Sequence, residues 1–196
     1  MRWSAVGWPG ALVAVWASLS QMALADESAG GPGSGLDAHA GLFVGKPAAL
    51  PTGLSTGGGA GFAWGARLAW GAETAWSTAT EHSTTHTVRH SDLRLHATGA
   101  LRRAIGRGSF ALRLGAGGTL VHETRRRDQG ERAGLTGDDL ETSAWRLLPS
   151  ADLTLVTSLA LVGAWGVEVS GGPAVYLREG EVHAGWSAML GVAWRP

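Results

Sequence analysis

The sequence has 196 residues, with 16 basic and 16 acidic side chains and no cysteine. A net charge of zero gives no electrostatic basis for binding DNA or RNA, so we expect no nucleic-acid partner. Small exported soluble domains often depend on disulfides, whereas a barrel closed by its own hydrogen bonds does not need them. The 31 glycines favour strands and turns over helices, and the length suits one domain.

The N-terminal segment has the form of a secretory signal. One basic residue precedes an apolar run over residues 3–19, and Ala23, Leu24 and Ala25 form a small-x-small cleavage site. A membrane anchor helix is the alternative, but a proline and a glycine interrupt the run, which is shorter than the roughly twenty apolar residues of a span. We therefore predict a cleaved signal peptide over residues 1–25 and a flexible, glycine-rich leader over residues 26–35.

Seven segments after the leader alternate apolar residues with small or polar ones. This alternation is typical of β-strands with one apolar face. The predicted strands cover residues 36–45, 60–76, 91–103, 109–122, 144–157, 159–177 and 182–194.

The segments between these strands contain turn and loop residues. Two prolines and three consecutive glycines predict a loop over residues 46–59. The polar residues 77–90 and the charged residues 123–143 predict two external loops, and short turns are expected at residues 105–108 and 178–181. Within the strands, Pro149 predicts a bulge and the Gly171-Gly172-Pro173 run predicts a kink.

The last predicted strand, residues 182–194, has an unbroken apolar face on its even positions. It is longer than the about five or six residues usual in soluble proteins, and it suits a tilted strand across a bilayer, which needs roughly nine to eleven. Trp186 and Trp194 lie about 26 Å apart along such a strand, or roughly 20 Å in depth after tilting. We predict an aromatic girdle at the two membrane surfaces formed by Trp64, Trp70, Trp76, Trp145, Trp165, Trp186 and Trp194.

The faces opposite the tryptophans carry small residues together with the charged ones. A water-soluble sheet would instead expose a polar face rich in Lys, Glu and Thr, while a narrow closed barrel needs small residues inside. We predict that this face lines the lumen and that its charges pair as a structural plug. A selective pore would need a wider lumen than eight strands enclose. The predicted lumen residues are Arg67, Glu73, Asp92, Arg94, Arg113, Arg146, Asp152 and Glu168.

The predicted architecture is an all-β, antiparallel up-and-down transmembrane β-barrel over residues 36–196. Bacterial single-chain barrels have an even number of strands, so seven candidates imply an eighth, which we expect within residues 46–59. Sixteen strands of about ten residues would leave almost nothing for loops, which excludes a general porin.

Three histidines recur at four-residue spacing, His82, His86 and His90, and on a helix this spacing would align them as metal ligands. On an extended strand, residues four apart are separated by about 13 Å, too far to share one ion. A folded loop could gather them with Glu81, but we expect solvated loop histidines, no metal site and no cofactor.

An enzyme would need a Ser–His–acid set near the rim of the barrel. His90, Ser91 and Asp92 are adjacent and so face opposite ways, and His183 lies about 13 Å from Ser187. We expect no enzymatic activity. A surface hydrolase acting on lipid or peptide, and a soluble periplasmic barrel that binds an apolar ligand, are the alternative functions.

Together these features resemble the small outer-membrane β-barrels of the OmpA, OmpX and OmpW type, over about residues 36–196. The resemblance implies location in the outer membrane of a Gram-negative bacterium, contact with outer-membrane lipid, and insertion by the outer-membrane assembly machinery. That machinery reads a last strand that usually ends in an aromatic residue, here Trp194, which Arg195 and Pro196 follow. We expect a monomer with a structural role or with surface recognition through its external loops.

Overall fold

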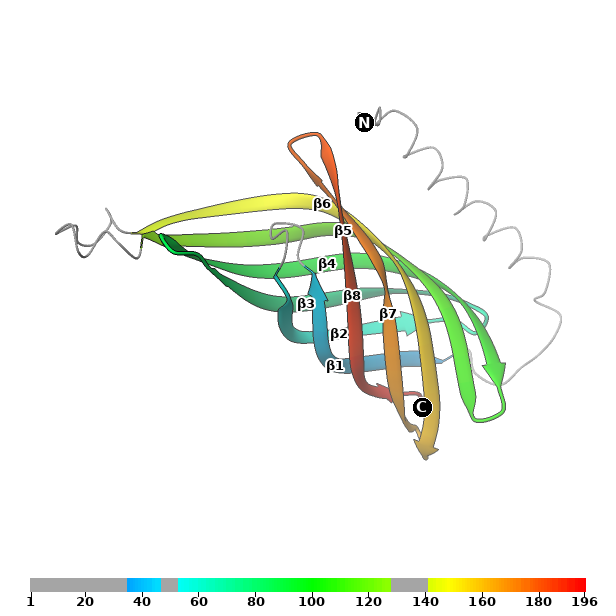
Figure 1. Cartoon of the computed structure of the whole chain (residues 1–196). Helices are drawn as coiled ribbons and strands as arrows, with labels where there is room; N and C mark the ends of the chain where they lie inside the picture. The colour runs from blue at the N-terminus through cyan, green and yellow to red at the C-terminus, as the bar shows by residue number, and fades with distance from the viewer. Residues whose placement is uncertain (1–34, 47–52, 128–140) are drawn as a thin grey trace.

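The protein is a closed barrel of eight antiparallel strands (Figure 1). The structure is a computed structural model that describes residues 35–46, 53–127 and 141–196. Within these ranges, no helix is long and apolar enough to cross a membrane. The predicted signal peptide and all but the last residue of the leader lie outside the described residues. The strands are β1 Leu36–Lys46, β2 Ser55–Trp64, β3 Leu68–His82, β4 His86–Ile105, β5 Gly108–Arg127, β6 Glu141–Val162, β7 Trp165–Arg178 and β8 Glu181–Trp194.

Each strand pairs with its neighbour in the chain, and β8 closes the ring by pairing with β1. The predicted fold class and the strand number are therefore confirmed. The last predicted strand, residues 182–194, corresponds to β8. The two short turns expected at residues 105–108 and 178–181 are also present.

The prediction of a single strand over residues 60–76 is wrong. The segment forms the end of β2 and the start of β3, separated by a turn at residues 65–67 in which Gly65 has a φ of 126°. Trp64 pairs with Trp70, so even-numbered residues face outward on both strands. The alternation therefore continues through the turn, and only the glycine, which tolerates a positive φ, marks the break.

The prediction of a loop at the glycine run is also wrong, because residues 57–59 lie inside β2. A Cβ on Gly59 would lie 3.0 Å from Met189 Sδ, and one on Gly61 would lie 2.7 Å from the ring of His39. The glycines thus make room for the larger side chains of Met189 on β8 and His39 on β1. The eighth strand begins in the region where it was expected and takes its second half from the segment expected to be one strand.

Several strands extend further than expected. Residues 77–82 and 86–90 are strand rather than loop, as are residues 123–127 and 141–143, and residues 159–162 belong to β6 rather than to β7. The pairing of β5 with β6 is regular through Pro149, so no bulge forms there. The pairing of β6 with β7 is interrupted at Gly172 and Pro173, while β7 stays in register with β8.

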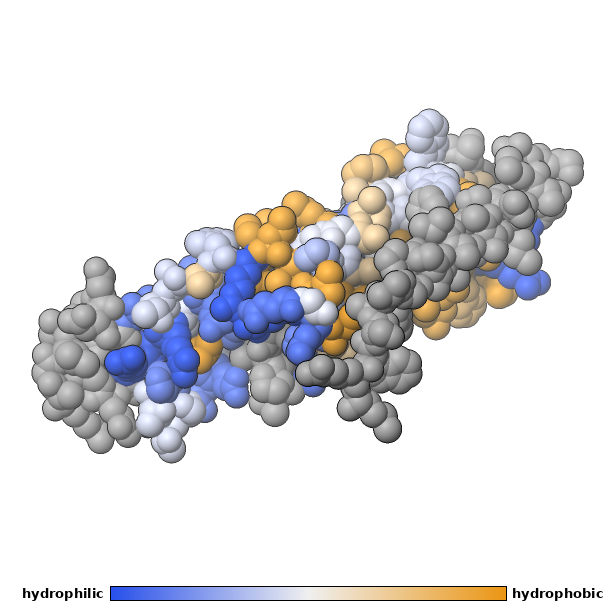
Figure 2. Space-filling view, turned by 90° about the horizontal axis from the view of Figure 1, so that it is seen from above, coloured by the Kyte–Doolittle hydropathy of each residue, from blue (hydrophilic) through white to orange (hydrophobic). Residues whose placement is uncertain are grey.

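The apolar and polar faces are reversed relative to a soluble barrel. Large apolar side chains point outward, for example Leu42 at 75% and Trp64 at 68% exposure, while charged residues such as Arg94 and Asp152 are buried inside at 6%. Figure 2 shows apolar side chains gathered over the middle of one face, with hydrophilic ones toward one end. A soluble barrel that binds an apolar ligand inside would need the opposite arrangement.

Strands β3 to β6 are longer than the others and form a sheet that projects beyond the ring at the end away from Trp194 (Figure 1). Residues 79–82 of β3 pair only with β4, and residues 141–149 of β6 pair only with β5. Among the described residues the projecting sheet therefore has two edges without a neighbouring strand. Pro149 lies on one of these edges, where a missing backbone donor is tolerated.

The seam between β1 and β8 depends on the pair Gly41 and Gly191. A Cβ on Gly191 would lie 2.1 Å from Ala40 O and 2.7 Å from Gly41 Cα. We expect Gly191→Val to force the two strands apart and to lower the free energy of unfolding by about 1–3 kcal/mol, as overpacking commonly does. Urea titration of protein folded in detergent or lipid measures this loss.

The matched control is Gly58→Val on β2, because a Cβ on Gly58 would meet only Gly41 O at 3.6 Å. This variant should keep the urea midpoint of the unmodified protein. Equal midpoints for the two variants would contradict the assignment of a tight closing seam.

Candidate functional site

The centre of the barrel is a cluster of buried ion pairs around Glu73 on β3. Arg94 Nη2 donates to Glu73 Oε1 at 2.9 Å, and Arg113 Nη1 lies 2.7 Å from Glu73 Oε2. The other guanidinium nitrogen of Arg94, Nη1, lies 3.3 Å from Asp152 Oδ2 and donates to Ser187 Oγ at 3.4 Å. Both carboxylates and both guanidinium groups are nearly inaccessible to solvent. Charges so far from water are tolerated when each has opposite charges and hydrogen-bond partners nearby.

A second set of hydrogen bonds joins β4 to β6. His96 Nδ1 lies 2.8 Å from Asp152 Oδ2, and His96 Nε2 lies 2.8 Å from Ser150 Oγ. Thr119 Oγ1 lies 2.9 Å from the same serine oxygen, and Thr154 donates to Asp152 Oδ1. Ser150, His96 and Asp152 therefore have the connectivity of a nucleophilic triad.

This connection crosses over β5, which contributes glycines where side chains would block it. A Cβ on Gly115 would lie 2.9 Å from both Asp152 Oδ1 and His96 Nδ1, and one on Gly117 would lie 3.1 Å from the ring of His96. Because β5 has no side chain at these two positions, His96 on β4 can reach the side chains of β6, two strands away. A side chain at either glycine would separate His96 from its partners on β6.

A third layer lies near the end of the barrel where Leu36 and Trp194 are found. Arg102 and Asp37 form an ion pair. His39 lies between two carboxylates, with Nε2 at 3.7 Å from Glu73 Oε2 and Nδ1 at 4.0 Å from Glu168 Oε1. The polar network therefore continues from the centre of the barrel to this mouth.

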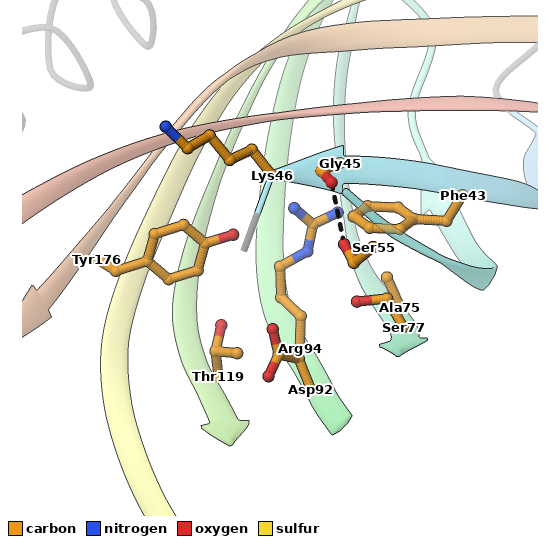
Figure 3. A pocket seen from close by; sticks show the side chains of 10 residues that line it. All are labelled: Phe43, Gly45, Lys46, Ser55, Ala75, Ser77, Asp92, Arg94, Thr119 and Tyr176. Atoms are coloured by element: carbon orange, nitrogen blue, oxygen red, sulfur yellow. Dashed lines mark hydrogen bonds between the residues drawn. The ribbon is translucent and has the colours of Figure 1, made fainter. Parts of the chain in front are cut away.

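At the other side of the central cluster, a small pocket opens above Arg94 (Figure 3). Asp92, Thr119 and Tyr176 line it, and the guanidinium of Arg94 lies 5.2 Å from the centroid of the Phe43 ring. Asp92 is buried, and within the described residues its Oδ1 has no hydrogen-bond partner. The pocket has room for about one water molecule.

Six of the eight predicted lumen residues lie buried inside the barrel, and two do not. Arg67 is exposed in the turn between β2 and β3, which corrects the expectation that it faces the lumen. Arg146 faces inward near the projecting end, with a side chain 38% exposed and 4.0 Å from Glu179. The buried six are Glu73, Asp92, Arg94, Arg113, Asp152 and Glu168.

Four members of the network were not expected from the sequence: His39, His96, Ser150 and Arg102. Their inward position follows from the alternation of β1, β4 and β6, so this signal was available for each. The pairing of a histidine with Ser150 and Asp152 depends on strand register and cannot be read from alternation. Register decides which inward residues meet.

The hydrolase candidates named from the sequence do not come together. His90 is buried and faces inward, and its neighbour Ser91 faces outward.

Two of the histidines at four-residue spacing have other partners. His82 lies on β3 and is hydrogen-bonded to Thr87, while His86 is hydrogen-bonded to Thr85. Within the described residues no three His, Asp or Glu side chains are placed to hold a metal ion.

The seven tryptophans of the predicted girdle all belong to outward faces. Trp64, Trp70, Trp165 and Trp194 lie toward the end with the short turns, and Trp76, Trp145 and Trp186 lie toward the projecting end. Trp145 stacks on His122 with ring centroids 4.2 Å apart. The outer face between the two groups is occupied by aliphatic side chains such as Leu95, Leu155 and Leu190.

Arg94 contacts two carboxylates, so its removal should be costly. We expect Arg94→Leu to leave Glu73 and Asp152 short of a counter-charge and to lower the free energy of unfolding by about 3–5 kcal/mol, the usual result of breaking a buried ion pair. Urea unfolding followed by tryptophan fluorescence measures it. Arg107→Leu, in the exposed turn between β4 and β5, is the matched control and should stay within about 0.5 kcal/mol of the unmodified protein. Equal losses in the two variants would refute the buried network.

Comparison with known proteins gives similarity in structure only. No protein-family model matches the sequence, and no curated protein matches it. The crystal structure of Ail, the attachment invasion locus protein of Yersinia pestis, is similar with a TM-score of 0.53 at 13% identity, covering 84% of this chain and 99% of that chain. The outer membrane protein OprG from Pseudomonas aeruginosa has a TM-score of 0.50 at 10% identity, covering 84% and 96%. The chain therefore has the fold of the small eight-stranded outer-membrane β-barrels.

Proposed function

We propose that this protein is an integral outer-membrane β-barrel with a closed interior and a structural or surface-recognition role. The observation that carries the proposal is the reversal of faces: the outer wall of the barrel is apolar and the charges are inside. Soluble monomers rarely expose continuous apolar patches larger than a few hundred Å². A barrel wall of leucine, valine and tryptophan over all eight strands suits lipid as its surroundings.

The hairpin lengths support one orientation in the membrane. The three connections at the Trp194 end are short, at residues 65–67, 106–107 and 163–164. Bacterial outer-membrane barrels have short periplasmic turns and longer extracellular loops. We therefore propose that this end faces the periplasm and that the projecting sheet of β3 to β6 faces the exterior.

The ion-pair cluster supports a closed lumen rather than a pore. Arg94, Glu73, Arg113 and Asp152 come from four different strands and meet at the centre of the ring. An eight-stranded barrel has an interior that side chains about fill. Passage of a hydrated ion would require these pairs to separate, at a cost of several kcal/mol.

Surface recognition is supported by the projecting sheet. Residues 141–149 of β6 form an edge that has no neighbouring strand among the described residues. An edge of this kind presents backbone N–H and C=O groups in a row, to which another extended chain can add as a strand. We propose that recognition uses this sheet together with the connections beyond it.

A second candidate function, hydrolysis, is favoured by the Ser150–His96–Asp152 arrangement. Catalysis also needs a reacting atom within reach of the serine oxygen and of oxyanion donors. Ser150 is buried, and its oxygen is already shared by His96 and Thr119. This geometry favours a structural role for the three residues over a nucleophilic one.

The orientation can be tested with single cysteines, because the chain has none of its own. Glu179→Cys, at a side chain that is 77% exposed in the turn between β7 and β8, should react with a membrane-impermeant maleimide on intact cells. Arg107→Cys, exposed at the opposite end, should react only after the outer membrane is permeabilised.

The two results together separate the alternatives. A soluble periplasmic protein would label at neither position on intact cells and at both after permeabilisation, which would overturn the proposal. Labelling at Arg107→Cys alone on intact cells would retain the membrane barrel and reverse its orientation.

The hydrolase candidate is tested by labelling with a fluorophosphonate, which reacts with activated serines. We expect no labelling of the folded protein, because the hydroxyl of Ser150 lies inside the closed lumen. Labelling that disappears in Ser150→Ala and in His96→Gln, with both variants still folded, would establish the second function instead.

A further inference from the structure

Arg195 lies directly after β8 and turns its side chain into the mouth of the barrel. Its Nη1 donates to Ser158 Oγ at 2.6 Å and to Ser109 Oγ at 3.2 Å. Its Nε lies 3.3 Å from Asp37 Oδ2, and its Nη2 lies 3.8 Å from Glu168 Oε2. Nη1 therefore has two hydrogen-bond partners inside the mouth, and Nε and Nη2 each lie within ion-pair distance of a carboxylate.

The four partners come from four strands on different sides of the ring. Asp37 is on β1, Ser109 on β5, Ser158 on β6 and Glu168 on β7. In a closed ring of eight strands, β1 and β5 lie opposite each other. One side chain thus links opposite walls of the barrel, which no backbone ladder can do.

The chemistry of this mouth fits a planar cation with several donors. It offers two carboxylates and two hydroxyls, and Ser109 Oγ and Ser158 Oγ lie 2.7 Å apart so that one N–H group can reach both. A guanidinium group presents five N–H donors in a rigid plane, whereas an ammonium group presents a compact charge with three. Arg102 also pairs with Asp37, so part of the negative charge at this site is neutralised without Arg195.

The backbone also holds the residue in place. Arg195 N donates to Ala164 O in the turn between β6 and β7 at 2.7 Å. Five small apolar residues form a buried cluster inside the barrel: Ala63, Ala69, Ala100, Ala111 and Val156. Of these, Ala111 on β5 and Val156 on β6 lie two residues further into the barrel than Ser109 and Ser158.

We propose that Asp37, Ser109, Ser158 and Glu168 form a binding site for a guanidinium group, and that Arg195 fills it and closes this mouth of the barrel. The site is occupied from within the chain, so no external ligand is needed in the unmodified protein. Removal of the Arg195 side chain creates a vacancy that a small alkylguanidinium ion fits and that sodium does not fill in the same way.

The test uses a reporter cysteine behind the site in this cysteine-free chain. Ala111→Cys places a thiol on β5, two residues inward from Ser109, at a position that is 8% exposed. The folded protein in detergent micelles is treated with a charged methanethiosulfonate reagent. We expect the thiol to react slowly with Arg195 present and several-fold faster in the Arg195→Ala background.

Methylguanidinium is then added to the Arg195→Ala protein. We expect it to restore the slow rate in a saturable manner, while an equal concentration of sodium chloride leaves the fast rate unchanged. Arg107→Ala, which removes an exposed charge from the same end of the barrel, should keep the slow rate without any addition.

Two results would overturn the proposal: a thiol in the Arg195→Ala protein that reacts as slowly as with arginine, or protection by sodium chloride equal to that by methylguanidinium. Should Arg195→Ala fail to fold, Arg195→Lys provides the same test. This variant keeps the positive charge but loses the planar guanidinium group. The reporter thiol of Ala111→Cys should then react at an intermediate rate, and methylguanidinium should lower that rate. An Arg195→Lys rate equal to that with arginine would show that any cation closes the mouth.

Discussion

The structure depends on neutralising the charge that is buried inside the closed ring of strands. Glu73 is the centre of this arrangement, because it accepts a hydrogen bond from Arg94, forms an ion pair with Arg113 and lies beside His39. Arg94 also contacts Asp152, and His39 also lies near Glu168. The glycines of β2 and β5 follow from the same constraint, because a large side chain of a nearby strand can extend over β2 or β5 only where that strand carries no side chain. The burial of paired charges inside the ring thus goes together with small residues on the inner face and apolar residues on the outer face.

The sequence predicted the fold class and the last strand, because alternation with a period of two is visible in a strand of any length, and the even number of strands in such barrels added the eighth. At three of the hairpins, one geometric reason explains why the turn was hard to place. Between β1 and β2, β2 and β3, and β6 and β7, the register pairs residues of equal parity, such as Trp64 with Trp70. The outward-facing residues are then all even-numbered or all odd-numbered on both sides of the turn. The alternation of apolar and polar residues therefore shows no break there. The other four hairpins change parity, and there the pattern itself indicates a turn.

Alternation also predicted which charges would face inward, but not which would meet. Arg67 fits the alternating pattern and yet lies in a turn, where the pattern has no structural meaning. His96 reaches Ser150 and Asp152 only because two glycines intervene on β5, and this depends on the register of three strands. Arg195 lies beyond the last alternating segment, so no period assigns it to the interior. Which residues meet inside the barrel depends on how the strands are aligned in the closed ring. The sequence of a single strand does not determine these contacts.

The reversed distribution of apolar and polar residues has a thermodynamic consequence. In a soluble protein, unfolding brings buried apolar side chains into water, and the heat capacity rises accordingly. Here the buried side chains are largely Arg, Glu, Asp, Ser and Thr, and the exposed ones are Leu, Val and Trp. Exposure of polar surface lowers the heat capacity instead. The free energy of unfolding of this barrel should therefore vary less with temperature than that of a soluble domain of equal length. The thickness and composition of the surrounding lipid should determine its maximum value.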